Sequence, residues 1–244
     1  MRWIAALTVA IGLTGPVLAE GFTAGQRAEI VEVLRRALRE DPSILRDALT
    51  ALEEADTRDR AEARRAAIAA NAAALFRDAA DPIKGNPNGD VTIVEFFDVR
   101  CGFCKQLHPA MDALVRRDPN VRVVLKDLPV LGPNSVLAAR ALLASHRQGR
   151  YAAFYDALLA LRVEPVEPVL RQQAERVGLD WTRLRRDMDD PAIARRIEAN
   201  LRLAQTLGIE GTPALVIGET LVPGAVDLPA LERLVAEARG AARR

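Results

Sequence analysis

The chain has 244 residues, of which half are hydrophobic and 27% are charged. This composition excludes intrinsic disorder and collagen-like repeats, and the length suffices for a core that needs no metal or disulfide to be stable. The 34 Lys and Arg residues nearly balance the 33 Asp and Glu residues. Because no field of one sign is present to attract nucleic acid or an anionic membrane, we expect neither as a partner.

The first nineteen residues have the pattern of a secretory signal peptide. Arg2 precedes an apolar run from Trp3 to Leu13, and small residues at Val17 and Ala19 suit signal peptidase. We expect cleavage after Ala19 and export of the mature chain. The apolar run is shorter than the roughly 20 residues that span a bilayer, so we expect no membrane anchor.

Two helices are expected at the start of the mature chain. Thr23 and Gln26 have the spacing of a capping box that begins the first helix, and Asp41-Pro42 separates it from the second. Each helix carries a short apolar stripe. The stripes are Ile30, Leu34 and Leu38 in the first helix, and Leu45, Leu49 and Leu52 in the second. A lone hairpin cannot bury both stripes, so packing against copies of the chain would complete their burial. The alternative is a hairpin folded back on its own chain in a monomer.

The segment from Glu53 to Ala80 is rich in alanine, and its large apolar residues are nearly confined to Ile68, Leu75 and Phe76. Helix propensity therefore predicts a helix that buries little of itself. At 1.5 Å per residue this helix would extend about 40 Å. We expect residues 20–82 to form an N-terminal helical oligomerisation region and stalk.

Cys101 and Cys104 are the only cysteines of the chain. A disulfide across two intervening residues closes too short a loop to stabilise a fold appreciably. Structural zinc needs two further ligands, and the remaining His108 and His146 do not have the spacing of a zinc finger or ribbon. Redox chemistry is the remaining role for this pair in an exported protein.

The residues around the cysteines predict a strand followed by a helix. The β-branched and aromatic run at 91–98 reads as a buried strand, and apolar residues at helical spacing follow Cys104. Cys101 then lies at the start of the helix, where free N–H groups and the helix dipole stabilise a thiolate. We expect Cys101 to be an exposed nucleophile and Cys104, one turn later, to be a buried thiol.

Two distant motifs carry a resemblance to a known family. Residues 96–109 (FFDVRCGFCKQLHP) resemble the active-site segment of the DsbA-like branch of the thioredoxin superfamily, and residues 208–217 (GIEGTPALVI) resemble its cis-proline loop. The resemblance covers about residues 83–240. It implies an α/β class thioredoxin fold with an inserted helical domain, and a protein-disulfide oxidoreductase that uses no cofactor.

The pattern of the chain is compatible with that fold. The strand at 91–98 and the cysteine-bearing helix are followed by a second, parallel strand at 121–126. The remaining predicted elements are a helical insertion at about 135–207, a hairpin of strands at 214–217 and 221–222, and a final helix that Asp227 caps and that ends near Gly240.

The resemblance also implies roles for individual residues. Pro213 matches a cis-proline that packs against the catalytic sulfurs, and the backbone of Thr212 would pair with an extended substrate peptide. Glu95 matches an acid that exchanges a proton with the buried cysteine. A buried carboxyl group suits that role because burial raises its pKa. The alternative for Glu95 is a salt bridge, for which Lys126 is a candidate partner. We interpret His108 as a helix-face residue beside Pro109, and His146 as a surface residue.

The dipeptide between the cysteines, Gly102-Phe103, tunes the redox poise. It lacks the histidine that strongly oxidising DsbA enzymes place there and is closer to the Gly-Tyr pair of the isomerase DsbC. The thiolate of Cys101 should therefore be less stabilised, and the protein a milder oxidant. We expect an isomerase or reductase, with a monomeric DsbA-like oxidase as the alternative.

The segment Phe22 to Glu53 resembles the N-terminal region of the suppressor-of-copper-sensitivity protein C (ScsC) family, in which such helices hold catalytic domains together as a trimer. This resemblance favours a periplasmic homotrimer that acts on exported client proteins and is reset by a membrane redox partner. Several joined catalytic domains suit isomerisation. The family's link to copper tolerance adds an alternative of another class, Cu(I) binding by Cys101 and Cys104. No other metal is expected.

Overall fold

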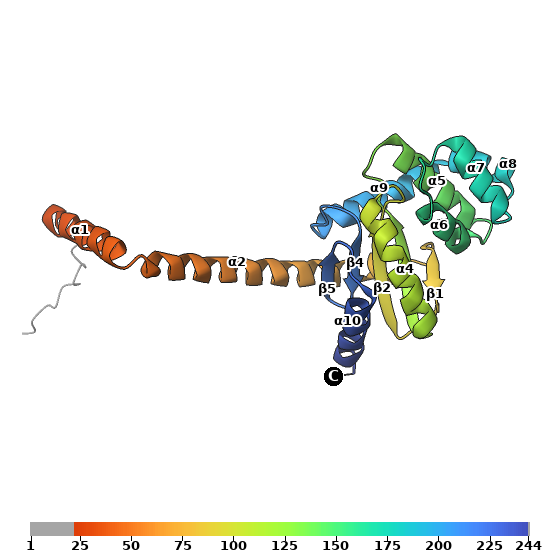
Figure 1. The fold of residues 1–244 in the computed structure, drawn as a ribbon. Coiled ribbons are helices and arrows are strands. Elements are labelled where there is room, and N and C mark those ends of the chain that lie inside the picture. Colours follow the sequence, from red (N-terminus) through yellow and green to blue (C-terminus); the bar gives the residue numbers. More distant parts are fainter. Residues whose placement is uncertain (1–21, 244) are drawn as a thin grey trace, which may run out of the picture. The chain divides into compact units, whose positions relative to one another are not determined.

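The computed structural model describes residues 22–243, and the predicted signal peptide lies outside them. The chain divides into two compact units, of which the first ends at Thr57 and the second begins at Arg58. The second unit contains a five-stranded mixed sheet and the helices that cover it (Figure 1). None of the described helices combines the length and the apolar character that crossing a membrane requires.

The first unit contains α1 (Ala24–Glu40) and the start of α2 (Ser43–Ala70). The predicted capping box is present, because the Gln26 amide donates to the Thr23 hydroxyl (3.3 Å) and the Thr23 amide donates to Gln26 Oε1 (2.9 Å). The break at Asp41-Pro42 is also confirmed. All six residues of the two apolar stripes are exposed in the single chain: Ile30, Leu34, Leu38, Leu45, Leu49 and Leu52.

The sheet of the second unit has the strand order β1-β3-β2-β4-β5. Its strands are β1 (Ile83–Gly85), β2 (Val91–Phe97), β3 (Val121–Asp127), β4 (Ala214–Ile217) and β5 (Thr220–Pro223). The central pair, β2 and β3, is parallel, and every other pairing is antiparallel. The predicted strands and the C-terminal hairpin are confirmed, whereas β1 was not expected from the sequence.

The helices of the second unit confirm a thioredoxin fold with a helical insertion. The insertion consists of α5 (Pro133–His146), α6 (Tyr151–Leu159), α7 (Glu167–Arg176), α8 (Trp181–Met188) and α9 (Pro191–Thr206). The other helices are α3 (Ala72–Phe76), α4 (Gly102–Arg117) and α10 (Leu228–Ala241). Asp227 caps α10 by accepting from the Ala230 amide at 2.9 Å. Figure 1 shows α5 to α8 gathered beyond one end of the sheet.

The sheet separates two apolar cores, because successive side chains of a strand point to opposite faces. Ile93 and Phe97 face the core that contains α4 residues such as Leu107. Val94 and Phe96 face the second core, which contains residues of α3 and α9. This alternation decides which polar residues of β2 and β3 can meet.

The expected stalk helix through Ala80 is wrong in its last part. Helix α2 ends at Ala70, and Ile68 and Leu75 are buried in the second core, which also contains Phe96. Burial of these large side chains on the sheet stabilises the fold more than solvent exposure on a longer helix would. Residues 68–76 therefore belong to the packed structure of the second unit.

Candidate active site

Cys101 lies at the junction of β2 and α4, where it is the N-cap residue of the helix. The loop between them is held by the buried carboxylate of Asp98, which accepts from the amides of Arg100 (2.8 Å), Val130 (3.0 Å) and Leu131 (3.1 Å). Because three amide donors fix one carboxylate, the backbone that enters Cys101 is rigidly placed. The predicted strand-to-helix position of Cys101 is confirmed.

The two cysteines are free thiols with different surroundings. Cys104 is fully buried, whereas Cys101 is 8% exposed. The expectation of an exposed Cys101 is therefore wrong in degree. The Cys101 thiol donates to the carbonyl oxygen of Thr212 at 3.1 Å, so the loop before β4 covers most of it. Cys101 remains the more accessible of the two sulfurs.

The loop that covers Cys101 contains a cis peptide bond between Thr212 and Pro213, as expected. Strand β4 begins directly after Pro213 and pairs with β2, so the sheet brings this loop beside the start of α4. Pairing of Thr212 with a substrate peptide stays a prediction.

Burial raises the pKa of the Cys104 thiol far above its ordinary value. Removal of the sulfur from water is the main cause, because a thiolate loses its solvation in the apolar core. Cys104 is thus a neutral thiol at rest, and its reaction requires a group that accepts its proton. The charge of Glu95 is among the groups that raise this pKa.

Glu95 is fully buried on the face of β2 that is directed toward α4. Its Oε2 atom accepts from the hydroxyl of Tyr155 at 2.9 Å, and its Oε1 atom has no hydrogen-bond partner among residues 22–243. Burial raises the pKa of the Glu95 carboxyl to about 7. A carboxyl group with this pKa can release and take up a proton near neutral pH.

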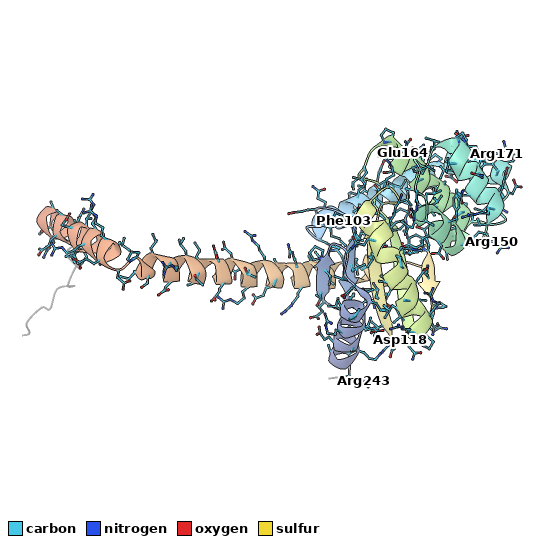
Figure 2. All side chains as sticks on the ribbon, viewed as in Figure 1. Phe103, Asp118, Arg150, Glu164, Arg171 and Arg243 are labelled. Atoms are coloured by element: carbon cyan, nitrogen blue, oxygen red, sulfur yellow. The ribbon has the colours of Figure 1, made fainter. Side chains whose placement is uncertain are left out.

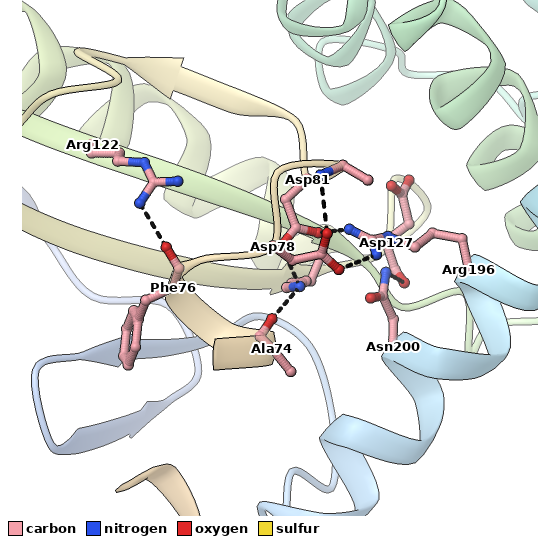
Figure 3. Close-up of polar contacts among 10 residues, drawn as sticks. Ala74, Phe76, Asp78, Asp81, Arg122, Asp127, Arg196 and Asn200 are labelled. Carbon is pink, nitrogen blue, oxygen red and sulfur yellow. Dashed lines mark hydrogen bonds and ion pairs between the residues drawn. The ribbon is translucent and has the colours of Figure 1, made fainter. Parts of the chain in front are cut away.

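Lys126 is not the partner of Glu95, so the salt-bridge alternative is wrong. In the register of β2 and β3, Glu95 lies opposite Leu125, and Lys126 lies opposite Phe96 on the other face of the sheet. There the Lys126 Nζ atom binds Asp81 at 2.5 Å and the Ala74 carbonyl at 2.7 Å (Figure 3).

Three further residues act on the Glu95 carboxyl group that sequence reasoning did not connect with it: Lys84, Asp112 and Tyr155. The Tyr155 ring contacts Phe97 edge to face, with ring centroids 4.8 Å apart. His108, interpreted as a helix-face residue, bonds Asp156 through Nε2 at 2.9 Å. His146 is exposed, as expected. A tyrosine in the apolar pattern of α6 was a weak signal for a buried polar contact, but its partner depends on the tertiary fold.

The dipeptide between the cysteines lies at the surface. Phe103 is 64% exposed and projects from the first turn of α4 (Figure 2). A Cβ atom at Gly102 would have open space around it. Both positions can therefore change without repacking of the core.

Comparison with known proteins shows the family of the domain that contains the site. The DSBA-like thioredoxin domain model matches residues 92–236, which is more than half of the chain. A thioredoxin-like oxidoreductase from Silicibacter pomeroyi is 43% identical, with a TM-score of 0.67 over 69% of this chain and 97% of that one. ScsC from Proteus mirabilis, in a transitional conformation, is 29% identical, with a TM-score of 0.67 over 90% of this chain and 97% of that one.

The curated relatives are longer proteins. A Na(+)/H(+) antiporter, NhaA 3 of Salinispora tropica, is 32% identical over 165 residues, which is 67% of this chain and 25% of the antiporter. The chain thus spans about a quarter of the curated relatives it matches.

Proposed function

The chain belongs to the DSBA-like thioredoxin domain family, and from this premise we propose that Cys101 and Cys104 are the redox pair of a protein thiol-disulfide oxidoreductase. The observation that carries the proposal is the contrast between the two sulfurs. Cys101 is the N-cap residue of α4 beside the Thr212-Pro213 loop and keeps some exposure, whereas Cys104 is fully buried and within electrostatic reach of Glu95. One sulfur can meet a client protein, and the other can resolve the product.

In the reducing direction, the thiolate of Cys101 attacks a client disulfide and forms a mixed disulfide, and the other client sulfur leaves as a thiolate. Cys104 then gives its proton to Glu95, and its thiolate attacks Cys101 Sγ. The Cys101–Cys104 bond forms, the bond to the client breaks, and two electrons have passed to the client. In the oxidising direction the same steps run in reverse, and Glu95 returns the proton to Cys104.

As an isomerase, Cys101 attacks an incorrect client disulfide, and a second client cysteine resolves the mixed disulfide without net oxidation. We place this activity, together with reduction, ahead of primary oxidation. Two features support that order. Gly102-Phe103 lacks a histidine that would stabilise the thiolate, and the apolar stripes of α1 and α2 are exposed in the single chain.

We further propose that the mature protein acts in the periplasm as a homo-oligomer, with a trimer favoured. Phe22, Ile30, Val33 and Leu34 line one apolar hollow on the first unit, and all four are exposed. Burial of such a surface between copies removes apolar area from water. The proposed clients of the enzyme are exported proteins with cysteines. A membrane redox partner would return the cysteine pair to its starting redox state.

Refolding of scrambled ribonuclease, beside reduction of insulin, tests the proposal. The mature protein should accelerate both reactions, and Cys101→Ser should abolish both. Titration of the reduced protein with Cu(I) is run in parallel, because replacement of both cysteines would remove either activity. Tight copper binding without refolding or reducing activity would overturn the enzyme proposal in favour of a copper-binding protein.

A further inference from the structure

Tyr155 joins the helical insertion to the carboxyl group beneath the cysteines. It is fully buried on α6, and its hydroxyl donates to Glu95 Oε2 at 2.9 Å. The ring is fixed from the sheet side by its edge-to-face contact with Phe97. Cys104 and Glu95 are both among the charges that raise the pKa of Tyr155, so the three groups form one electrostatic cluster.

The hydrogen bond makes the two oxygens of Glu95 inequivalent. Oε2 uses a lone pair to accept from Tyr155, whereas Oε1 is buried without a partner in the part of the chain that the structure describes. When the carboxyl group is neutral, its proton is therefore best placed on Oε1, because Oε2 already faces a donor. Oε1 is then the oxygen that is free to exchange a proton.

We propose that Tyr155 is a positioning residue for thiol-disulfide exchange: its hydroxyl holds Oε2 of Glu95 and leaves Oε1 as the oxygen that exchanges the proton with Cys104. This inference rests on the proposed function of the cysteine pair. During resolution of a mixed disulfide, the Cys104 S–H bond breaks, an O–H bond forms at Oε1, and the Cys104 thiolate attacks Cys101 Sγ. The client sulfur leaves with the electron pair of the broken S–S bond.

Other charged groups face the same carboxyl group and act on its pKa together with Tyr155. They are Lys84 on β1 and Cys104, His108 and Asp112 on α4, and Asp156 on α6 contacts both Lys84 and His108. Burial raises the pKa of Glu95, and the Tyr155 hydrogen bond, then His108 and Lys84, lower it. Loss of the Tyr155 hydroxyl should therefore raise this pKa further.

The chain provides a matched control for this residue. Tyr151 lies one turn earlier on α6, is also buried, and donates to Asp127 Oδ2 at 2.7 Å. The two tyrosine rings are stacked with centroids 6.5 Å apart. Tyr151→Phe thus removes a hydroxyl from the same helix and leaves the hydrogen bond between Tyr155 and Glu95 in place. Because the chain has only these two tyrosines, fluorotyrosine incorporated into Tyr151→Phe labels position 155 alone.

The experiment follows resolution of the mixed disulfide in a single turnover with oxidised glutathione. Reduced wild-type protein, Tyr155→Phe and Tyr151→Phe are mixed with oxidised glutathione across a pH series, quenched with acid and separated by mass. In the wild type the rate should rise with pH as Glu95 becomes a carboxylate. Tyr155→Phe should move the midpoint of this rise upward by about one pH unit, the effect of losing one hydrogen bond to a charged group. Tyr151→Phe should leave the midpoint in place.

Fluorotyrosine at position 155 keeps the hydroxyl and should shift the pH midpoint in the direction opposite to that of Tyr155→Phe. Its phenol is a stronger donor, so the midpoint should move downward relative to unlabelled Tyr151→Phe. This measurement decides the question even where Tyr155→Phe does not fold. Equal midpoints in the labelled and unlabelled protein would overturn the inference. A wild-type protein that forms no mixed disulfide at Cys101 would instead overturn the proposed function.

Discussion

The Cys101 sulfur lies 3.1 Å from the carbonyl oxygen of Thr212, a residue 111 positions further along the chain. The contact is a hydrogen bond from the thiol, so it must break before the Cys101 sulfur can attack a client disulfide. A client that pairs with the backbone of Thr212 would engage the same loop. A client that binds this loop could therefore displace the Thr212 carbonyl from Cys101 and expose the sulfur that attacks.

Alkylation should separate the two cysteines. At neutral pH the first equivalent of iodoacetamide should modify Cys101, and Cys104 should react only after the protein is unfolded, because it is fully buried and burial raises its pKa. Peptide mass mapping after limited reaction gives the distribution. As a functional counterpart, Cys104→Ser should accumulate mixed disulfides with clients that carry disulfides, because Cys101 attacks the client disulfide, one client sulfur leaves as a thiolate, and no second enzyme sulfur is present to resolve the product. Equal modification of both sulfurs in the folded protein would contradict the assigned roles.

The buried carboxyl group of Asp127 should make the wild-type fold less stable as pH rises. Burial raises its pKa from 3.8 to about 7, so the protonated form contributes stability that is present below pH 3.8 and is lost as pH rises to 7. Asp127→Asn removes this titration. Relative to wild type, the variant should gain about 4 kcal/mol between pH 4 and pH 8. Urea unfolding of both proteins at the two pH values checks this, and a constant difference would refute it.

The buried ion pair of Asp81 and Lys126 should contribute far more to stability than the partly exposed ion pair of Asp78 and Arg196 (Figure 3). Asp81→Ala leaves the Lys126 cation buried without its carboxylate, so it should cost about 3–5 kcal/mol. Asp78→Ala is the matched control, because Asp78 binds Arg196, as Asp81 does, but is partly exposed. It should cost about 1 kcal/mol or less. Similar losses for both variants in urea unfolding would contradict the argument.

Strands β2 to β5 and helices α4 and α10 could be predicted from the sequence because each has a local pattern of apolar residues, whereas the insertion could be predicted only as a mostly helical segment. β2 and β3 are β-branched runs, and Asp227 has the local pattern of a helix cap. β1 escaped prediction because its three residues include Lys84 and Gly85, and its strand conformation comes from pairing with β3.

The cysteine pair and Glu95 could also be proposed from the sequence, because they lie within one short segment. Their partners could not. Tyr155 meets Glu95 across 60 residues, and the assignment of Lys126 to Asp81 rather than to Glu95 depends on which face of β3 it occupies. Likewise, the burial of Ile68 and Leu75 could not be predicted, because the residues that cover them belong to later parts of the chain. Local patterns predict elements, whereas long-range contacts set the chemistry.

The apolar face of α1 should govern the oligomeric state. Leu34→Asp places a charge among exposed apolar residues that we propose to be buried between copies, so it should convert an oligomer of the mature protein into monomers. Arg36→Asp puts the same side chain on the opposite face, since residues advance by 100° around a helix, and should leave the oligomer intact. Light scattering behind size exclusion gives the molar masses. If the wild-type protein is a monomer, the apolar stripes no longer support an isomerase.

Phe103→His should make the protein a stronger oxidant of its clients. Position 103 lies in the first turn of α4 and is 64% exposed, so an imidazole fits there without repacking. A histidine at this place can donate to the Cys101 thiolate or carry a positive charge beside it, and both stabilise the reduced, ionised form. The variant should oxidise a reduced client faster and accelerate refolding of scrambled ribonuclease less than wild type. Phe103→Tyr, which keeps the ring without an imidazole, is the control. Unchanged oxidation by Phe103→His would show that residue 103 does not tune the pair.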